Sequence, residues 1–327
     1  MSQNPSKTSD IVEKAYRGLA ERLFEKASAA CDRLETDDPE ALHDFRVALR
    51  RLRTHLSTHR DHLGKHHANE FRKRLSALVA ATNTSRDQEV QREWIQRRLE
   101  DSQLEGIERD GLELVLTRFS TNGNSTNELE PIRQHFADIG KKFQKRRWSL
   151  PEHTRSKDTP NRGVGAVTKA AILKLAAKLR KQVAAIDSVD SVKATHQARL
   201  AVKRLRYILE PLENVTPGAA EVIDELKGMQ DTLGAIRDLQ ILHLQIALAA
   251  GVADELGDES LEGPLGAVPA IVPSPPALDD AERKALDAAL DHVRVAAQKE
   301  FKVLQERWLD NKAAPLLKHI EKLVATL

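Results

Sequence analysis

The sequence predicts an all-α protein, on three observations. Ala, Leu, Arg, Lys and Glu dominate the composition, and all five have a high helix propensity. Apolar residues recur with the 3.6-residue period of an amphipathic helix along nearly the whole chain. No stretch alternates between apolar and polar residues for long enough to indicate a strand, so we expect a helical fold without a sheet.

Helical periodicity runs through a series of segments separated by short breaks. Two segments have clear start signals, because Asp38 precedes Pro39 and Thr216 precedes Pro217, as an N-cap precedes a proline in the first turn. The segments cover about 9–35, 39–60, 66–81, 84–100, 105–121, 127–148, 163–186, 190–210, 217–234, 236–250, 279–308 and 312–326.

Two segments interrupt this helical pattern. Residues 149–163 are polar and carry two prolines, so they read as a connection between halves. Residues 263–280 carry five prolines and cannot be helical, so we expect a long loop there. The sequence therefore predicts two helical halves, 9–150 and 163–327, which together form one domain.

Composition restricts the classes of function. The formal net charge of the 327 residues is only +2, so any anion-binding site must come from segregation of charge. Cys31 is the single cysteine, which excludes an intrachain disulfide and suits a reducing compartment. No apolar run approaches the ~18 residues of a membrane span, and the first ten residues have no apolar signal core. We therefore expect a soluble cytoplasmic protein.

An internal repeat is the most informative feature. The stretch "ALHDFRVALRRLRTHL" from Ala41 has a counterpart in "THQARLAVKRLRYILE" from Thr195, and an offset of 153 places His43 on His196. A second pair of stretches, 74–90 and 225–241, repeats an Arg-Asp pair. Repetition of two elements in the same order predicts a duplicated helical module of about 150 residues.

Each copy of the repeat carries a row of basic residues. The first basic row is His43, Arg46, Arg50 and Arg53, and the second basic row is His196, Arg199, Lys203 and Arg206. On a helical wheel each row borders an apolar stripe instead of lying opposite it. The stripes are Phe45, Leu49, Leu52 and Leu56 in the first copy, and Ala198, Val202, Leu205 and Leu209 in the second. Two rows placed beside the core could therefore face one shared groove.

The alternative is that both rows are solvated faces whose acidic partners lie on neighbouring helices. Repetition of the whole row in both halves favours a binding role, because duplication preserves core positions readily but needs a further reason to preserve four cations. Arg51 and Arg204 repeat as well, although they lie apart from both stripes.

The stretches "HDFRVALRRLR" and "HQARLAVKRLRY" resemble the two signature helices of the CHAD family, the conserved histidine α-helical domains. The "SRDQEV" and "IRDLQI" segments resemble the second recurring element of that family, and the resemblance covers about 9–327. It implies two pseudo-symmetric bundles of about four helices each. It also implies a basic surface that binds inorganic polyphosphate, and association with polyphosphate granules. Relatives often carry a triphosphate-hydrolysing CYTH domain, for which this chain has no room, so the implied role is binding without catalysis and without a cofactor.

The chemistry of both rows suits a polyphosphate chain. Such a chain carries about one negative charge per phosphate, and helical spacing puts cations ~5–6 Å apart along a line. Arginine binds phosphate oxygens bidentately, and histidines near a polyanion hold their protons more tightly. The candidate binding residues are His43, Arg46, Arg50, Arg51, Arg53, His196, Arg199, Lys203, Arg204 and Arg206. Secondary candidates are Arg72, Arg74, Lys141, Lys142, Lys174 and Lys178.

Other polar groups have simpler interpretations. Arg86–Asp87 and Arg237–Asp238 are expected to be structural, with each aspartate fixing the rotamer of a row arginine. His55, His59 and His62 share a helical face at metal-ligand spacing, but no cysteine or carboxylate completes a site, so we expect a solvated helix end and no metal. Cys31 is expected to be a buried small apolar residue.

Two further classes of function stay open. A nucleic-acid binder would use the same rows, but aromatic residues make up only 4% of the chain and leave few stacking surfaces. A metal-dependent phosphohydrolase would need clustered carboxylates beside rows that are nearly free of acids. The sequence favours polyphosphate as the partner, with granule proteins as further candidates, and disfavours nucleic acid and membranes.

Overall fold

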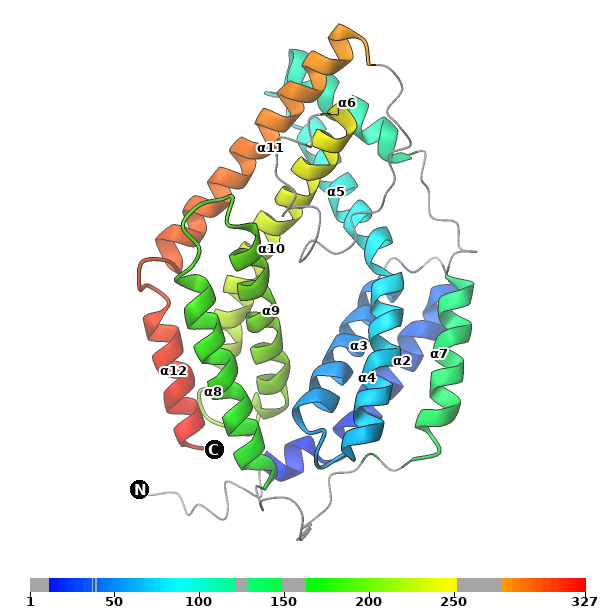
Figure 1. Cartoon of the computed structure of the whole chain (residues 1–327), viewed down its shortest axis with the longest axis vertical. Helices are drawn as coiled ribbons and strands as arrows, with labels where there is room; N and C mark the ends of the chain where they lie inside the picture. Colours follow the sequence, from blue (N-terminus) through cyan, green and yellow to red (C-terminus); the bar gives the residue numbers. More distant parts are fainter. Residues whose placement is uncertain are drawn as a thin grey trace.

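The computed structural model describes residues 12–36, 38, 40–120, 129–146, 148, 163–251 and 278–327, without the side chains of 83–89, 119 and 120. The predicted loop at 263–280 lies outside these residues except for its last three. Every regular element in the described residues is helical, which confirms the all-α fold (Figure 1).

The helices follow the predicted periodicity closely. Residues 12–16 are helical, and two short 3-10 turns, η1 (Arg33–Glu35) and η3 (Glu210–Leu212), extend longer helices. The α-helices of the first half are α2 (Leu19–Asp32), α3 (Ala41–Thr58), α4 (Lys65–Ala81), α5 (Asn83–Leu99), α6 (Gly106–Ser120) and α7 (Glu130–Phe143). Those of the second half are α8 (Val164–Val183), α9 (Val192–Leu209), α10 (Ala219–Ala250), α11 (Asp280–Arg307) and α12 (Ala314–Ala325).

The second half departs from the prediction at α10. We predicted two helices, 217–234 and 236–250, but one helix of 32 residues runs through both. Gly234 does not end it, since this glycine is buried and gives room to the guanidinium of Arg199 on α9. The helix begins after Gly218, which has a left-handed φ of 82°, and not at Pro217.

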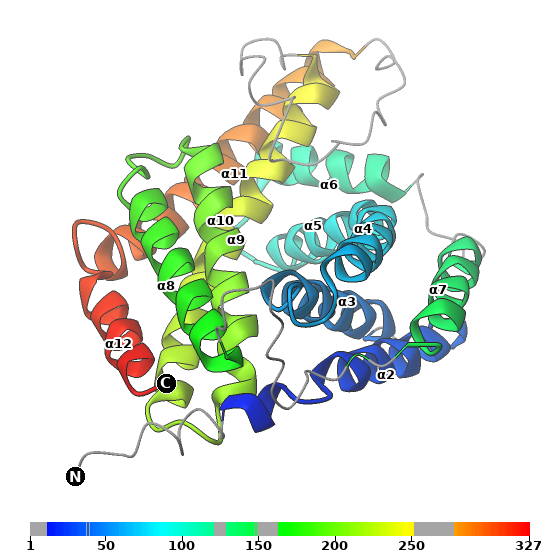
Figure 2. The ribbon, with the colours of Figure 1, turned by 60° about the horizontal axis from the view of Figure 1, so that its bottom comes forward.

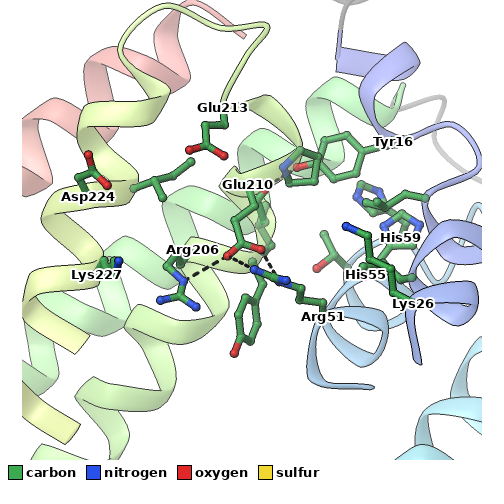
Figure 3. Close-up of a pocket in the computed structure, with 17 residues that line it drawn as sticks. Tyr16, Lys26, Arg51, His55, His59, Arg206, Glu210, Glu213, Asp224 and Lys227 are labelled. Atoms are coloured by element: carbon green, nitrogen blue, oxygen red, sulfur yellow. Dashed lines mark hydrogen bonds and ion pairs between the residues drawn. The ribbon is translucent and has the colours of Figure 1, made fainter. Parts of the chain in front are cut away.

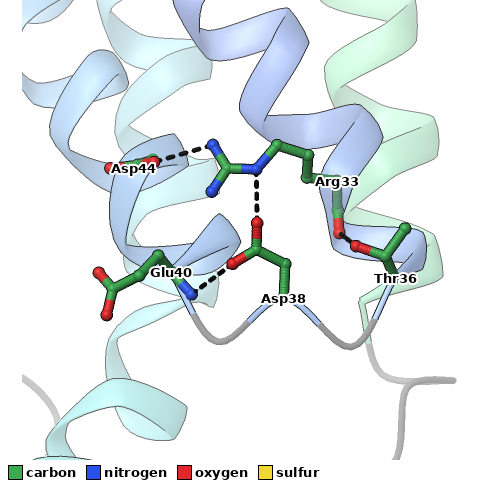
Figure 4. Close-up of polar contacts among 5 residues, drawn as sticks. All are labelled: Arg33, Thr36, Asp38, Glu40 and Asp44. Carbon is green, nitrogen blue, oxygen red and sulfur yellow. Dashed lines mark hydrogen bonds and ion pairs between the residues drawn. The ribbon is translucent and has the colours of Figure 1, made fainter.

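The turn into α3 fixes the direction of the first signature helix (Figure 4). We predicted Asp38 as the N-cap, but the helix begins at Ala41, and the Asp38 carboxylate accepts a bond from the backbone N–H of Glu40 at 2.9 Å. Arg33 then bridges the turn to the helix, with Nε 2.7 Å from Asp38 and Nη1 2.9 Å from Asp44. Asp44 is the acid inside the signature stretch, and it forms its ion pair with Arg33.

Two hydrophobic cores divide the helices differently from the two halves. The larger core takes residues from α2, α3, α4, α7, α8, α9, α12, the first part of α10 and the end of α11. The smaller core joins α5 and α6 of the first half to α10 and α11 of the second. Figure 1 shows this smaller unit at the top, with α10 and α11 running into it from below. The division into two duplicated halves stays a prediction.

A close helix contact holds the smaller unit together. A Cβ added at the buried Gly111 of α6 would lie 2.0 Å from the carbonyl oxygen of Ala285 on α11. Glycine is costly within a helix, so its presence here reflects the space that only glycine leaves.

Gly111→Ala should therefore lower the free energy of unfolding by about 1–3 kcal/mol, because the added methyl group forces the two helices apart. Gly228→Ala is the matched control within α10, where the nearest atom to an added Cβ is 3.8 Å away. Helix propensity alone should make that change neutral or stabilising by up to about 1 kcal/mol. Urea unfolding of both variants checks the difference, and equal stabilities would contradict the contact.

Candidate anion-binding site

The packing of α3 against α9 brings the two signature helices together (Figure 2). All eight residues of the predicted apolar stripes are fully buried, which confirms the amphipathic interpretation of both helices. Because each basic row borders its stripe, burial of the stripes carries both rows to the junction between the helices.

Lys203 marks the place where the rows meet. Burial, followed by the nearby charges of Arg199, Arg50 and Arg46, lowers the pKa of its amine to about 6, and Asp238 opposes this only in part. Arg46 and Arg50 belong to α3, whereas Lys203 and Arg199 belong to α9. Arg46, Arg50, Arg199 and Lys203 therefore form one cluster of cations that share an electrostatic environment.

His196 of α9 is close to the same cations and also to basic residues of α8 and α10. Burial, then the charges of Arg237, Arg199 and Lys203, lowers its pKa to about 4. Lys178 of α8 adds to this effect and donates a hydrogen bond to Gln197 at 2.8 Å. The sequence predicted a structural role for Arg237, and it is 3% exposed; its charge also acts on His196, so it lies near the candidate site. Its presence in the repeated Arg-Asp element was the signal.

Arg46 and Arg199 are each held by a polar contact. Arg46 is buried and donates from Nη1 to the carbonyl oxygen of Thr82 at 2.6 Å, so it ties α3 to the end of α4. Arg199 Nη2 lies 4.0 Å from Asp238 Oδ1, as we predicted for the aspartate of the Arg-Asp pair. The side chains of Arg86 and Asp87 lie outside the described residues.

Arg51 and Arg206 converge on a single carboxylate (Figure 3). Glu210 Oε2 lies 2.6 Å from Arg51 Nε, and Glu210 Oε1 lies 2.9 Å from Arg51 Nη2 and 3.2 Å from Arg206 Nε. Both guanidinium groups also stack over the ring of Tyr207. Burial lowers the pKa of Arg51, but the hydrogen bond to Glu210 and the charge of Glu210, with smaller contributions from Tyr207 and Asp44, together outweigh burial, so the pKa is raised.

Arg53 and Arg204 form a second arginine pair without an acid. Burial, then the charges of Arg50, Arg204 and Arg72, lowers the pKa of Arg53. Arg72 of α4 therefore lies close enough to Arg53 to add its charge to the cluster. Within the described residues, Arg53 and Arg204 make no ion pair.

The remaining candidates are not joined to the cluster by any contact among the described residues. His43 is exposed in the first turn of α3. Arg74 pairs with Glu70 at 2.8 Å, and Lys141 pairs with Asp138 at 3.0 Å. Lys142 of α7 and Lys174 of α8 are exposed, so the last group lies on solvated helix faces.

A pocket of about 550 Å³ lies beside the Glu210 bridge, between α2, α3, α9 and α10 (Figure 3). His55 and His59 form part of its wall and are 5% and 1% exposed, so our expectation of a solvated helix end is wrong for this part of 55–67. Their rings pack against Tyr16, whose hydroxyl donates to the carbonyl oxygen of Ile208.

Among the described residues, no three His, Cys, Asp or Glu side chains are grouped so as to hold a metal ion. Cys31 is buried, as predicted. None of the described helices is both long enough and apolar enough to cross a membrane.

Stability should fall on acidification because of the two histidines. Burial lowers the pKa of His55 to about 3 and that of His59 well below its usual value, whereas both titrate near 6.5 when unfolded. The unfolded chain thus binds protons first, and each histidine costs up to about 1.4 kcal/mol of stability per pH unit below about 6.5. The free energy of unfolding should keep its full histidine contribution above that pH and decline steadily toward pH 5.

The measurement is a series of urea unfolding curves from pH 7.5 to 5. A double variant, His55→Leu with His59→Leu, should show a shallower decline, whatever its absolute stability. A decline as steep as that of the parent protein would place the acid sensitivity elsewhere.

The fold and the convergent rows define the class of protein: an all-helical protein built around a pair of basic helices. The CHAD domain family matches residues 18–247, which is more than half of the chain. The chain therefore belongs to the CHAD domain family.

Solved structures agree with this at the level of the fold. The crystal structure of the CHAD domain from the plant Ricinus communis matches with a TM-score of 0.53 and 17% identity, over 97% of this chain and 92% of that chain. PptA from Streptomyces chartreusis matches with a TM-score of 0.58 and 18% identity, over 92% of this chain and 98% of that chain. The comparison with curated proteins gives no match.

Proposed function

We propose that this protein binds inorganic polyphosphate along the junction of α3 and α9, and that it associates through this binding with polyphosphate granules in the cytoplasm. The observation that carries the proposal is the position of Lys203, between the arginines of its own row and those of the row on α3. The CHAD domain family is linked to polyphosphate binding in general, which supports the same conclusion.

Crowding of positive charge is the physical reason. The charges of Arg50 and Arg199 act on Lys203, and those of Arg50, Arg204 and Arg72 act on Arg53. Among the described residues, Asp238 offsets the effect on Lys203 only in part, and Asp44 is engaged by Arg33. A polyanion would relieve this repulsion and restore full protonation of the cluster. Arginine and lysine side chains from two helices would line successive phosphates.

A nucleic acid fits this surface less well. Proteins that bind single strands usually stack bases on exposed aromatic rings. Tyr207 is the ring beside the cations Arg51 and Arg206, and it is buried. A chain of phosphates without bases needs only the cations, so we infer binding without catalysis and without a cofactor.

Removing positive charge where the two basic rows meet, at Arg50 and Lys203, should weaken binding strongly. Arg50→Gln and Lys203→Gln should each weaken the affinity for long-chain polyphosphate by about tenfold or more, since each removes a charge-assisted contact. Together they should deviate from additivity, because both side chains would contact one ligand. Lys299→Gln, which removes an exposed charge on α11, is the matched control.

Binding should be measured by titration across salt concentrations, with DNA at equal phosphate concentration as the competitor. For six or more engaged phosphates the affinity should fall by orders of magnitude between about 50 and 200 mM salt. A flat salt dependence, or equal losses in the Lys299 variant, would refute the proposed site. Preference for DNA would favour the nucleic-acid alternative.

Binding should also take up protons. In the free protein the pKa of Lys203 is about 6 and that of His196 about 4, and a polyanion favours the protonated form of both. The bound pKa values are then higher than the free values, so affinity should rise as pH falls from about 9 toward 6, chiefly through Lys203. Lys203→Arg should keep the affinity and flatten this rise, because arginine stays charged.

Calorimetry in buffers of different ionisation enthalpy measures the proton uptake directly. A parent protein that takes up no proton, or a Lys203→Arg variant with an unchanged pH profile, would show that Lys203 does not contact the ligand.

A further inference from the structure

The two arginine pairs at the α3–α9 junction occupy corresponding positions in the repeat. The offset of 153 that relates the signature stretches carries Arg51 onto Arg204 and Arg53 onto Arg206. The pair Arg51 with Arg206 therefore corresponds to the pair Arg204 with Arg53. Each pair takes one arginine from α3 and one from α9, as expected for two sides of a pseudo-symmetric contact.

One pair is closed by an internal anion. The Glu210 carboxylate bonds Arg51 through two nitrogens and reaches Arg206 at 3.2 Å. The carboxylate follows α9 directly, in η3, so the chain itself holds it next to the arginines. The Glu210 side chain is only 20% exposed, and both of its oxygens are engaged in these contacts with the two arginines.

The other pair is open. The same offset carries Ser57 onto Glu210, so the position that could supply a carboxylate holds an exposed serine in the last turn of α3. Within the described residues, Arg53 and Arg204 have no acidic partner, and Arg50 and Arg72 add further positive charge beside them.

Resting on the proposed function, we propose that Glu210 is a built-in competitor that closes one arginine pair, so that polyphosphate binds through the open pair formed by Arg53 and Arg204. A carboxylate and a phosphate bond arginine through the same bidentate geometry. A carboxylate tethered next to its arginines has a high effective concentration, so an incoming phosphate must displace it. Glu210 therefore decides on which side of the α3–α9 junction the polyphosphate binds.

Two substitutions test this proposal: one adds a carboxylate to the open arginine pair, and the other removes the carboxylate from the closed pair. Ser57→Glu places a carboxylate where the open pair would meet it and should weaken the affinity for long-chain polyphosphate by about tenfold, the loss of at least one charge-assisted contact. Glu210→Gln frees Arg51 and Arg206 and should raise the affinity several-fold. It should also steepen the dependence of log affinity on log salt by about 1–2, as expected for one or two additional phosphate contacts.

Glu213→Gln is the control for net charge. Glu213 lines the same pocket, is exposed, and makes no ion pair with a described residue. Its substitution changes the charge by the same amount without freeing an arginine, so it should leave the salt dependence unchanged. Melting temperatures without ligand check that each variant folds. If Glu210→Gln does not fold, the exposed Ser57→Glu substitution still decides.

The outcomes separate this inference from the proposed function. A parent protein that does not bind polyphosphate refutes the proposed function itself. A parent protein that binds, with Ser57→Glu unchanged or with Glu210→Gln no different from Glu213→Gln, overturns the inference and leaves the proposed function standing. Weaker binding by Ser57→Glu together with tighter, more salt-dependent binding by Glu210→Gln supports it.

Discussion

The structure depends on one constraint: the basic rows of α3 and α9 lie beside the apolar stripes through which these helices pack. Each fully buried leucine or phenylalanine contributes about 1.5–3 kcal/mol, and six of the eight stripe residues are of these types. Burial of the stripes therefore outweighs the repulsion between cations that it brings together. The fold concentrates positive charge because its core requires the contact.

Internal acids moderate this repulsion selectively. Asp44, although it lies within the first signature helix, is turned to Arg33 across the α2–α3 connection. Asp238 reaches Arg199, and Glu210 takes up two arginines at the far end of α9. Lys203, Arg53 and Arg204 lie between these ends, and within the described residues Arg53 and Arg204 make no ion pair. A chain with a net charge of only +2 thus keeps a strongly basic strip without being basic as a whole.

The periodicity of the sequence predicted the all-α fold, the burial of Phe45 and Leu205, and the pairing of Asp238 with a row arginine. It could not predict the burial of Arg46 or the capture of Arg51 and Arg206 by Glu210. A helical wheel shows which residues share a face, but the partners that arrive from α4 and η3 depend on tertiary packing. The prediction of two helices at 217–234 and 236–250 was wrong, because one helix runs through Gly234, which gives space to Arg199 on another helix.

The uninterrupted course of α10 has a consequence for insertions and deletions. Its residues belong to the larger core up to Ile236 and to the smaller core from Leu239, so Arg237 and Asp238 occupy the boundary. One residue gained or lost within this helix would rotate everything beyond it by about 100°, turning either the basic strip or the smaller core out of phase. Length variation among relatives should therefore gather at the ends of α10 and α11, while the span between the two cores keeps its residue count.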